Sequence, residues 1–278
     1  MTFRALVTDL DGTLLDEQGR VHEADADAIA ELQRRGVVVT IATGRMFSGT
    51  RRIAREIGVE GPVACVDGSH IADALDGRER ACAPIPLASA DPLLAGLARH
   101  RPVTYVFAHD RVYHDERGEP FLQYVRTWSE ELHAVEDVLD PAHWGAVPSI
   151  AAVVGIGTEE QIRGVADHIA EAGHPIACAA FAVRKAGIEG VWGMVVRSHG
   201  VDKGTALSWL AEHHAVSTEE VVAVGDWVND IPMLRAAGRS FAMAQAPDTV
   251  RAAATDVLEA SVATGGGIRE AARRAGLL

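Results

Sequence analysis

Short apolar runs alternate with amphipathic stretches along the first part of the chain. Residues 3–8 form an apolar run without a period, which is typical of a strand covered on both faces. Residues 23–35 place apolar side chains at helical spacing, and Gly36 follows a basic pair, as at many helix ends. The alternation continues with a strand, a helix and a strand at residues 37–42, 46–57 and 62–66. This pattern predicts a parallel α/β sheet.

The pattern changes after Asp67-Gly68-Ser69 and returns after Lys203. Residues 73–86 are rich in turn-forming types and predict a loop, and His109-Asp110 lies between two runs that predict a hairpin. The middle region has predicted strands at residues 103–107, 112–114, 150–156, 176–183 and 191–196, and predicted helices at 120–132 and 159–172. After Lys203 we expect helices at residues 205–213, 231–237 and 267–275, and strands at 221–224, 240–244 and 256–258.

These elements predict two domains. Residues 1–82 and 195–278 would form an α/β core with a Rossmann-like, doubly wound parallel sheet. Residues 83–194 mix hairpins with helices and would form an inserted α+β domain. We find no internal repeat and no low-complexity tract.

Composition and charge exclude several classes of protein. Hydrophobic residues make up 48% and charged residues 23%, which excludes a disordered or collagen-like chain. Lys and Arg number 26 against 39 Asp and Glu, and this net charge of −13 argues against a nucleic-acid partner, which needs clustered cations. A bound phosphate would therefore need a metal, a lysine or backbone amides. The only lysines are Lys185 and Lys203.

The remaining composition indicates the compartment. The three cysteines, Cys65, Cys82 and Cys178, are odd in number and widely spaced, as in neither a disulfide framework nor a zinc site. No signal-peptide pattern and no run of ~20 apolar residues is present. We expect a cytoplasmic protein with no membrane partner, as a monomer or a homodimer.

Acids, hydroxyls and a lysine gather at the predicted ends of strands and the start of a helix. In an open α/β sheet, ligands bind beyond the carboxyl ends of the strands, so these residues predict one site. Clustered carboxylates need a cation, and oxygen ligands without Cys or His favour Mg²⁺. A lysine suits phosphate as a point charge, one aspartate can attack phosphorus, and another can transfer protons. The residues are Asp9, Asp11, Thr43, Gly44, Lys203, Asp226 and Asp230.

Four segments make the chain similar to the haloacid dehalogenase (HAD)-type hydrolases, specifically the Cof-like branch with a cap domain inserted after the third core strand. They are residues 9–15 (DLDGTLL), 42–45 (ATGR), 201–204 (VDKG) and 225–230 (GDWVND). The resemblance covers essentially the whole chain, and it identifies the inserted domain of residues 83–194 as the cap.

The resemblance implies a role for each of these residues. Asp9 would be the nucleophile and a Mg²⁺ ligand. Asp11 would be the general acid and base, with its backbone carbonyl on the metal. Asp226 would be the other protein ligand, and Asp230 would support the metal shell or Lys203. The transferring phosphoryl group would be held by Thr43, Gly44 and Lys203, with Asn229 nearby.

The implied function is that of a Mg²⁺-dependent phosphatase acting on small phosphorylated metabolites through an aspartyl-phosphate intermediate. Sugar phosphates, pyridoxal phosphate and flavin mononucleotide are the substrate types that the resemblance suggests. A phosphomutase and a non-catalytic phosphometabolite-binding module on the same scaffold remain as alternatives.

The chain also departs from the Cof-like pattern. Asp67 stands where relatives usually have Asn, and it either changes what the leaving group meets or serves a turn that accepts both residues. Gln245 stands where relatives often have Asn, which argues against a ligand role there. Trp227 either packs against the junction of core and cap or contacts substrate. Arg45 either reaches substrate or forms a surface salt bridge, and the hairpin around His109 either selects substrate or is a solvated turn.

Overall fold

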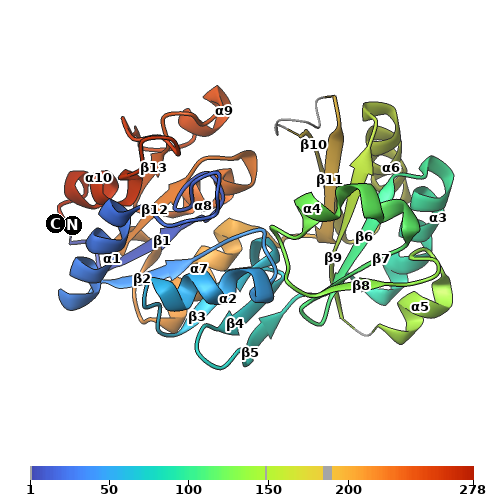
Figure 1. Cartoon of the computed structure of the whole chain (residues 1–278), viewed down its shortest axis with the longest axis horizontal. Helices are drawn as coiled ribbons and strands as arrows, with labels where there is room; N and C mark the ends of the chain where they lie inside the picture. The colour runs from blue at the N-terminus through green and yellow to red at the C-terminus, as the bar shows by residue number, and fades with distance from the viewer. Residues whose placement is uncertain (1, 148, 184–189) are drawn as a thin grey trace. The chain divides into compact units, whose positions relative to one another are not determined.

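The computed structural model describes residues 2–147, 149–183 and 190–278 (Figure 1). The chain divides into two compact units, Met1–Ala81 with Asp202–Leu278, and Cys82–Val201. The boundary expected at 82/83 lies one residue from the first division. The boundary expected at 194/195 falls inside strand β11 (Trp192–Ser198), which pairs with strands of the second unit. Lys185 lies outside the described residues.

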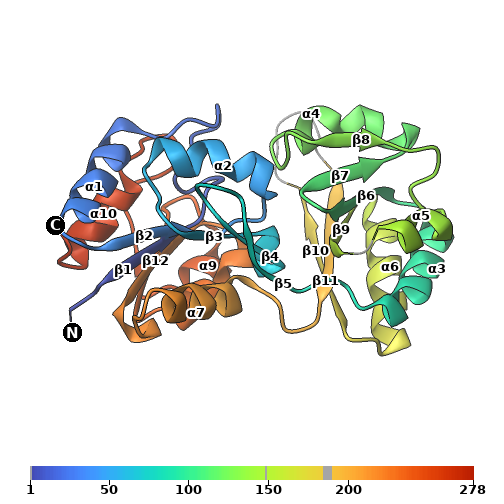
Figure 2. The ribbon, with the colours of Figure 1, turned by 90° about the horizontal axis from the view of Figure 1, so that it is seen from below.

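The first unit contains a parallel sheet with helices on both faces, as expected. Its strands lie in the order β14-β13-β12-β1-β2, with bounds Asp256–Val257, Arg239–Ala242, Val221–Gly225, Ala5–Thr8 and Val38–Ile41. Helices α1 (Glu23–Arg34) and α10 (Gly267–Arg274) pack together on one side, and α7 (Lys203–His213) lies on the other (Figure 2). Ala5 and Val7 of β1 belong to one buried cluster with Leu207 and Leu210 of α7. This arrangement confirms the predicted doubly wound fold.

The remaining elements of this unit border the sheet. They are α2 (Phe47–Glu56), β3 (Pro62–Cys65), β4 (His70–Asp73), β5 (Glu79–Cys82), α8 (Ile231–Ala236) and α9 (Asp248–Arg251). Strand β3 pairs antiparallel with β4, and Ala64 makes a parallel bridge to Ala42 beyond β2. The loop predicted at residues 73–86 is wrong, because β5 lies within it. The residues of β5 are exposed or half-buried, so no apolar run indicates the strand.

The second unit contains a mixed sheet in the order β10-β11-β9-β6-β7-β8. Besides β11, its strands are Ile176–Ala182, Ile150–Gly157, Val103–Ala108, Arg111–His114 and Leu132–Ala134. All pairings are antiparallel except that of β7 with β8. Its helices are α3 (Ala90–His100), α4 (Leu122–Val125), α5 (Pro141–Ala146) and α6 (Glu159–Ala172). The helix predicted at 120–132 is mostly wrong, since only α4 is α-helical there.

The cap hairpin expected around His109 is present. The β6–β7 turn holds His109 and Asp110, both at positive φ, +51° and +58°. Among the described helices of both units, none combines the length and the apolarity that crossing a membrane requires.

The carboxylate of Asp25 joins the two packed helices of the first unit. Asp25 lies on α1, is 1% exposed, and accepts hydrogen bonds from the backbone N–H groups of Gly266 and Arg269 at 2.9 and 3.0 Å. These donors lie at the start of α10, where the helix has no internal acceptors for them. The side chain therefore satisfies the end of one helix from the body of another.

Asp25→Ala should lower the free energy of unfolding by about 1–3 kcal/mol, because it leaves partly buried backbone donors without an acceptor. Asp27→Ala is the matched control on the same helix, since the Asp27 side chain is 69% exposed. It should change stability by less than about 0.5 kcal/mol. Urea unfolding of the three proteins measures the difference, and equal losses in both variants would contradict the assignment.

Candidate active site

The carboxyl ends of three neighbouring parallel strands bring the predicted site residues together. Thr8, the last residue of β1, is in register with Val224 of β12 and with Ile41 of β2. Asp9, Asp226 and Thr43 follow these strands, so they lie at the same edge of the sheet. This edge is the expected location of a ligand site in such a fold.

A buried lysine joins the carboxylates at this edge. The Lys203 side chain is 1% exposed, and its Nζ donates to Oδ1 of Asp9 at 2.5 Å and to Oδ1 of Asp230 at 2.6 Å. Burial lowers the pKa of Lys203, but the carboxylates of Asp230, Asp9 and Asp67 raise it more, and the net shift is upward. Lys203 is thus a permanent buried cation.

The start of helix α7 fixes the position of Lys203. The Asp202 side chain caps the helix by accepting hydrogen bonds from the N–H groups of Gly204 and Thr205, each at 2.9 Å. The Thr205 hydroxyl accepts from the Asp202 N–H in return, which completes a capping box. Lys203 is the first helical residue, so the cap sets the direction from which its side chain enters the site.

The Asp230 carboxylate organises the loop after β12. It is fully buried, and its Oδ2 accepts hydrogen bonds from the backbone N–H groups of Asp226 and Trp227, both at 2.8 Å. Its Oδ1 accepts from Lys203. Both oxygens therefore bind protein donors, and Asp230 shapes the loop and holds Lys203.

The carboxylates of Asp9, Asp226 and Asp230 form a buried group that could hold a cation. One oxygen from each lies within 4.8 Å of the others. Burial raises the pKa of Asp9 well above its ordinary value, although Lys203 opposes the shift. Burial and the neighbouring Asp230 raise the pKa of Asp226 to about 7. Since the Asp230 oxygens are occupied by donors, Asp9 and Asp226 fit a hard cation best.

Three residues hold the loop that carries Asp9 and Asp11 against Asp226. The Thr13 hydroxyl donates to Oδ1 of Asp226 at 2.9 Å. Gly12 has a φ of +86°, and a Cβ atom there would lie 2.4 Å from Oδ2 of Asp226, so only glycine fits. The Gln245 amide donates to the Gly12 carbonyl at 2.6 Å. No role was predicted for Thr13, and Gln245 holds this loop through the Gly12 carbonyl.

Asp11 differs sharply from Asp9 in its surroundings. Its side chain is 52% exposed, and both of its oxygens accept hydrogen bonds from the Arg45 guanidinium, that from Nε to Oδ2 being 2.7 Å. The Arg45 side chain is only 10% exposed and also donates to the Gly49 carbonyl at 3.3 Å. Of the two alternatives left open for Arg45, the structure shows a salt bridge, and it joins a buried arginine to the half-exposed Asp11.

The predicted phosphate-binding residues lie beside Asp67. Thr43 is 1% exposed, and its carbonyl accepts a hydrogen bond from the Asp67 N–H at 2.9 Å. The Asn229 amide donates to Oδ1 of Asp67 at 2.8 Å. A Cβ atom on Gly44 would lie 3.4 Å from this oxygen and 3.8 Å from the Asn229 nitrogen. Asp67 is therefore more than a turn residue, because its carboxylate lies within the predicted phosphate-binding group.

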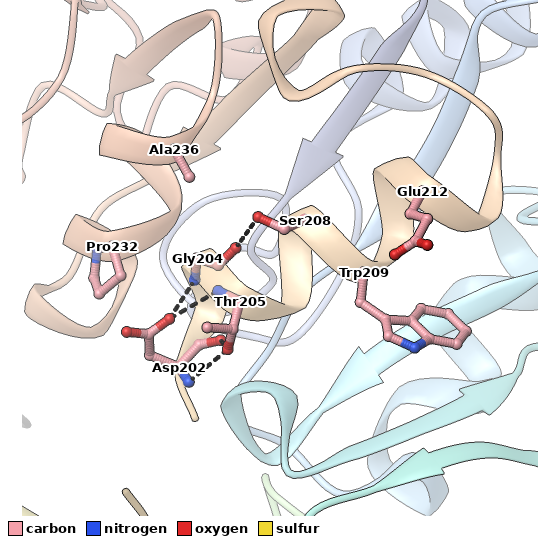
Figure 3. Close-up of a pocket in the computed structure, with 8 residues that line it drawn as sticks. All are labelled: Asp202, Gly204, Thr205, Ser208, Trp209, Glu212, Pro232 and Ala236. Carbon is pink, nitrogen blue, oxygen red and sulfur yellow. Dashed lines mark hydrogen bonds between the residues drawn. The ribbon is translucent and has the colours of Figure 1, made fainter. Parts of the chain in front are cut away.

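A groove of about 520 Å³ runs along α7 and α8, next to the segment that carries Lys203 (Figure 3). Two of its polar side chains form hydrogen bonds with the backbone of α7. Asp202 caps the helix, and the Ser208 hydroxyl donates to the Gly204 carbonyl at 3.1 Å. None of the site carboxylates lines this groove. Its lining residues are Asp202, Gly204, Thr205, Ser208, Trp209, Glu212, Pro232 and Ala236.

Comparison with known proteins identifies the family of the chain. A family model described as haloacid dehalogenase-like hydrolase matches residues 6–269. The chain is 26% identical over 271 residues to pyridoxal phosphate phosphatase YbhA of Escherichia coli K12, covering 93% of this chain and 94% of that one. It is 26% identical over 256 residues to a phosphoglycolate phosphatase of Methanopyrus kandleri, covering 92% of this chain and 90% of that one.

The structural comparison gives the same fold. The solved structure of BT1666 from Bacteroides thetaiotaomicron, studied among phosphatases of the haloalkanoate superfamily, superimposes with a TM-score of 0.81 at 23% identity. The match covers 100% of this chain and 96% of that one. The expected family and core fold are confirmed.

Lys203→Met should lower the free energy of unfolding by about 3–5 kcal/mol at neutral pH, because it leaves buried carboxylates without their cation. The pKa of Asp9 is already raised in the folded protein, and removing the ammonium raises it further. A raised folded-state pKa stabilises the fold at low pH and loses that effect as pH rises, so the deficit should shrink between pH 7 and pH 5.

Urea unfolding at several pH values measures this. Arg239→Met is the matched control, since Arg239 and Asp256 form an ion pair with side chains 31% and 35% exposed. It should cost less than about 1 kcal/mol at either pH. A Lys203→Met deficit that stays constant with pH would show that the carboxylates are not the cause.

Proposed function

The chain belongs to the haloacid dehalogenase-like hydrolases and is a phosphoric monoester hydrolase, and from this premise we propose a Mg²⁺-dependent phosphatase of small phosphorylated metabolites. The observation that carries the proposal is the buried Lys203, whose ammonium donates a hydrogen bond to Asp9. Asp9 and Asp226 also belong to one buried group of carboxylates that could hold a cation. One cation, a metal position and a carboxylate at a strand end are what transfer of a phosphoryl group to aspartate requires.

The first step forms an aspartyl phosphate on Asp9. The free lone pair of an Asp9 carboxylate oxygen attacks phosphorus, and the bond from phosphorus to the leaving oxygen breaks. Asp11, as a carboxylic acid, donates its proton to that oxygen, so the leaving group departs as an alcohol. Lys203 stabilises the charge that the carboxylate and the phosphoryl group share.

The second step returns Asp9 to its resting state. The Asp11 carboxylate takes a proton from water, and the water oxygen attacks phosphorus. The bond between phosphorus and the Asp9 oxygen then breaks, which releases inorganic phosphate. Thr43, Gly44 and Asn229 hold the phosphoryl oxygens in both steps, and Asp230 keeps Lys203 in position.

Asp9 and Asp226 are the residues that would hold Mg²⁺. Their buried oxygens and raised pKa values favour a bound cation, and no sulfur or imidazole ligand competes in this group. When bound, the ion supplies Lewis acid chemistry that reduces the repulsion between the carboxylates and an anionic substrate.

The substrates we propose are small phosphate esters of the pyridoxal phosphate, sugar phosphate or flavin mononucleotide type. Support comes from the pyridoxal phosphate phosphatase and the phosphoglycolate phosphatase, which resemble the chain over most of their lengths. The active-site residues all lie in the first unit, and we propose that the second unit is the cap that selects the leaving group.

Wild-type protein should release phosphate from members of a panel of these esters when Mg²⁺ is present and should stop when a chelator removes it. Asp9→Asn should reduce release by about 10³-fold or more, because the amide is no longer a nucleophile. Asp16→Asn is the matched control, since Asp16 lies on the same segment but pairs with Arg20. Absence of release from every ester would reject the proposed function.

Arg45→Lys should impair the hydrolysis of alkyl phosphates more than that of 4-nitrophenyl phosphate. Arg45 holds both oxygens of Asp11, and lysine cannot form this fork. Only a poor leaving group needs the proton from Asp11, so we expect losses in kcat of about 10- to 100-fold for alkyl esters and of about threefold or less for the aryl ester.

The control for this experiment is Arg52→Lys, because Arg52 lies on α2 with its side chain 63% exposed. Steady-state kinetics with both ester types measure the ratio. Equal losses for the two ester types would mean that Arg45 supports the fold rather than the position of Asp11.

A further inference from the structure

Gln245 joins two loops of the first unit next to the residues that we propose to hold Mg²⁺. Its amide Nε2 donates to the Gly12 carbonyl at 2.6 Å, and its Oε1 accepts from the Val262 N–H at 3.1 Å. A backbone N–H can only donate and a carbonyl can only accept, so the two partners require one and the same orientation of the amide. Gln245 is therefore matched to both loops.

The loop that carries Val262 is itself fixed. The Ala260 N–H donates to the Glu270 carboxylate of α10 at 2.9 Å, and the Ala244 N–H donates to the Ala260 carbonyl at 3.0 Å. These bonds anchor the backbone on both sides of the Gln245 amide. Gln245 can therefore hold the Gly12 carbonyl in place rather than follow its movement.

The Gly12 carbonyl lies where such a contact has a large effect on the loop. Gly12 has a φ of +86°, and without a Cβ atom its backbone rotates at lower cost than that of any other residue. Its carbonyl belongs to the planar peptide that leads into Thr13, whose hydroxyl donates to Oδ1 of Asp226 at 2.9 Å. A rotation of this carbonyl would turn the whole peptide and shift the Thr13 hydroxyl.

Both oxygens of Asp226 depend on the position of this peptide. Oδ1 accepts the hydrogen bond from Thr13, and the Gly12 backbone packs so closely against Oδ2 that a Cβ atom would not fit. Partners that orient a ligand carboxylate in this way commonly set the affinity of a metal site. The contact between Gln245 and Gly12 is thus connected to a proposed Mg²⁺ ligand through a single peptide.

We propose that Gln245 is a positioning residue for the metal site and that its hydrogen bond to the Gly12 carbonyl raises the affinity of Asp9 and Asp226 for Mg²⁺. The proposal rests on the Mg²⁺-dependent function proposed above. The length of the side chain is part of it, because asparagine is one carbon shorter and cannot reach both Gly12 and Val262 unless the backbone shifts.

The test is calorimetric titration of the whole chain with Mg²⁺, without substrate. Gln245→Leu keeps the size of the side chain and removes its polar atoms, so the dissociation constant of Mg²⁺ should rise by about 3- to 10-fold, the range of one lost hydrogen bond. Gln33→Leu is the matched control, since the Gln33 amide also donates to backbone carbonyls, those of Ile57 and Gly58 at 3.0 and 2.9 Å. These carbonyls belong to a turn without site residues, so the control should keep the wild-type constant.

Two further measurements separate positioning from support of the fold. Gln245→Asn keeps the amide but shortens the side chain, so its Mg²⁺ constant should lie between those of wild type and Gln245→Leu. In steady-state kinetics of Gln245→Leu, the Mg²⁺ concentration for half-maximal phosphate release should rise by the calorimetric factor, while kcat at saturating Mg²⁺ stays within about twofold. A lower stability in urea together with an unchanged Mg²⁺ constant would overturn the proposal.

Failure of the proposed function gives a different result. A wild-type protein that binds Mg²⁺ but releases phosphate from no ester rejects the phosphatase, and the calorimetric comparison still decides the role of Gln245. Mg²⁺-dependent phosphate release with equal Mg²⁺ constants in wild type and Gln245→Leu overturns the role of Gln245 alone. A wild-type protein that binds no Mg²⁺ overturns both.

Discussion

The site depends on the ion pairs that the Lys203 ammonium forms with buried carboxylates. Carboxylates at the ends of β1 and β12 repel one another, and burial makes that repulsion severe. Lys203 lies 2.5 Å from Asp9 and 2.6 Å from Asp230, so one cation holds two strand ends together. The capping box at Asp202 is part of the same arrangement, because it fixes the first turn from which the lysine extends.

The buried carboxylates around Lys203 divide into two kinds. Asp230 uses both oxygens on protein donors, so it stabilises the loop and the lysine. Asp9 and Asp226 have fewer such donors and raised pKa values, which leaves them with unfavourable charge until a cation arrives. The charges of these two carboxylates therefore favour a bound metal ion, which the proposed reaction needs.

Local sequence patterns were sufficient to predict the core sheet, the family and the segments that carry the site. An apolar run is visible in consecutive residues, so it indicates a strand without knowledge of the fold. Parallel strands bring the acids that follow them to one edge of the sheet, so the grouping of these acids could also be predicted. Two sets of contacts were not predictable: the hydrogen bonds from Arg45 to Asp11 and the hydrogen bond from Gln245 to the Gly12 carbonyl. They depend on the directions of side chains from segments that are distant in the sequence. Strand β5 was missed for a simpler reason, since its four residues are exposed or half-buried and form no apolar run.

Asp9 and Asp11 show how position along one loop can separate two proposed roles. Asp9 directly follows β1, and its side chain is 6% exposed, whereas that of Asp11 is 52% exposed. Leu10, between them, is fully buried, and the left-handed Gly12 turns the chain immediately afterwards. A buried carboxylate on a fixed ammonium suits attack on phosphorus, and an exposed one held by a rigid guanidinium suits exchange of protons with water. Identical side chains thus suit different proposed roles because one lies directly at the end of β1 and the other lies two residues beyond it.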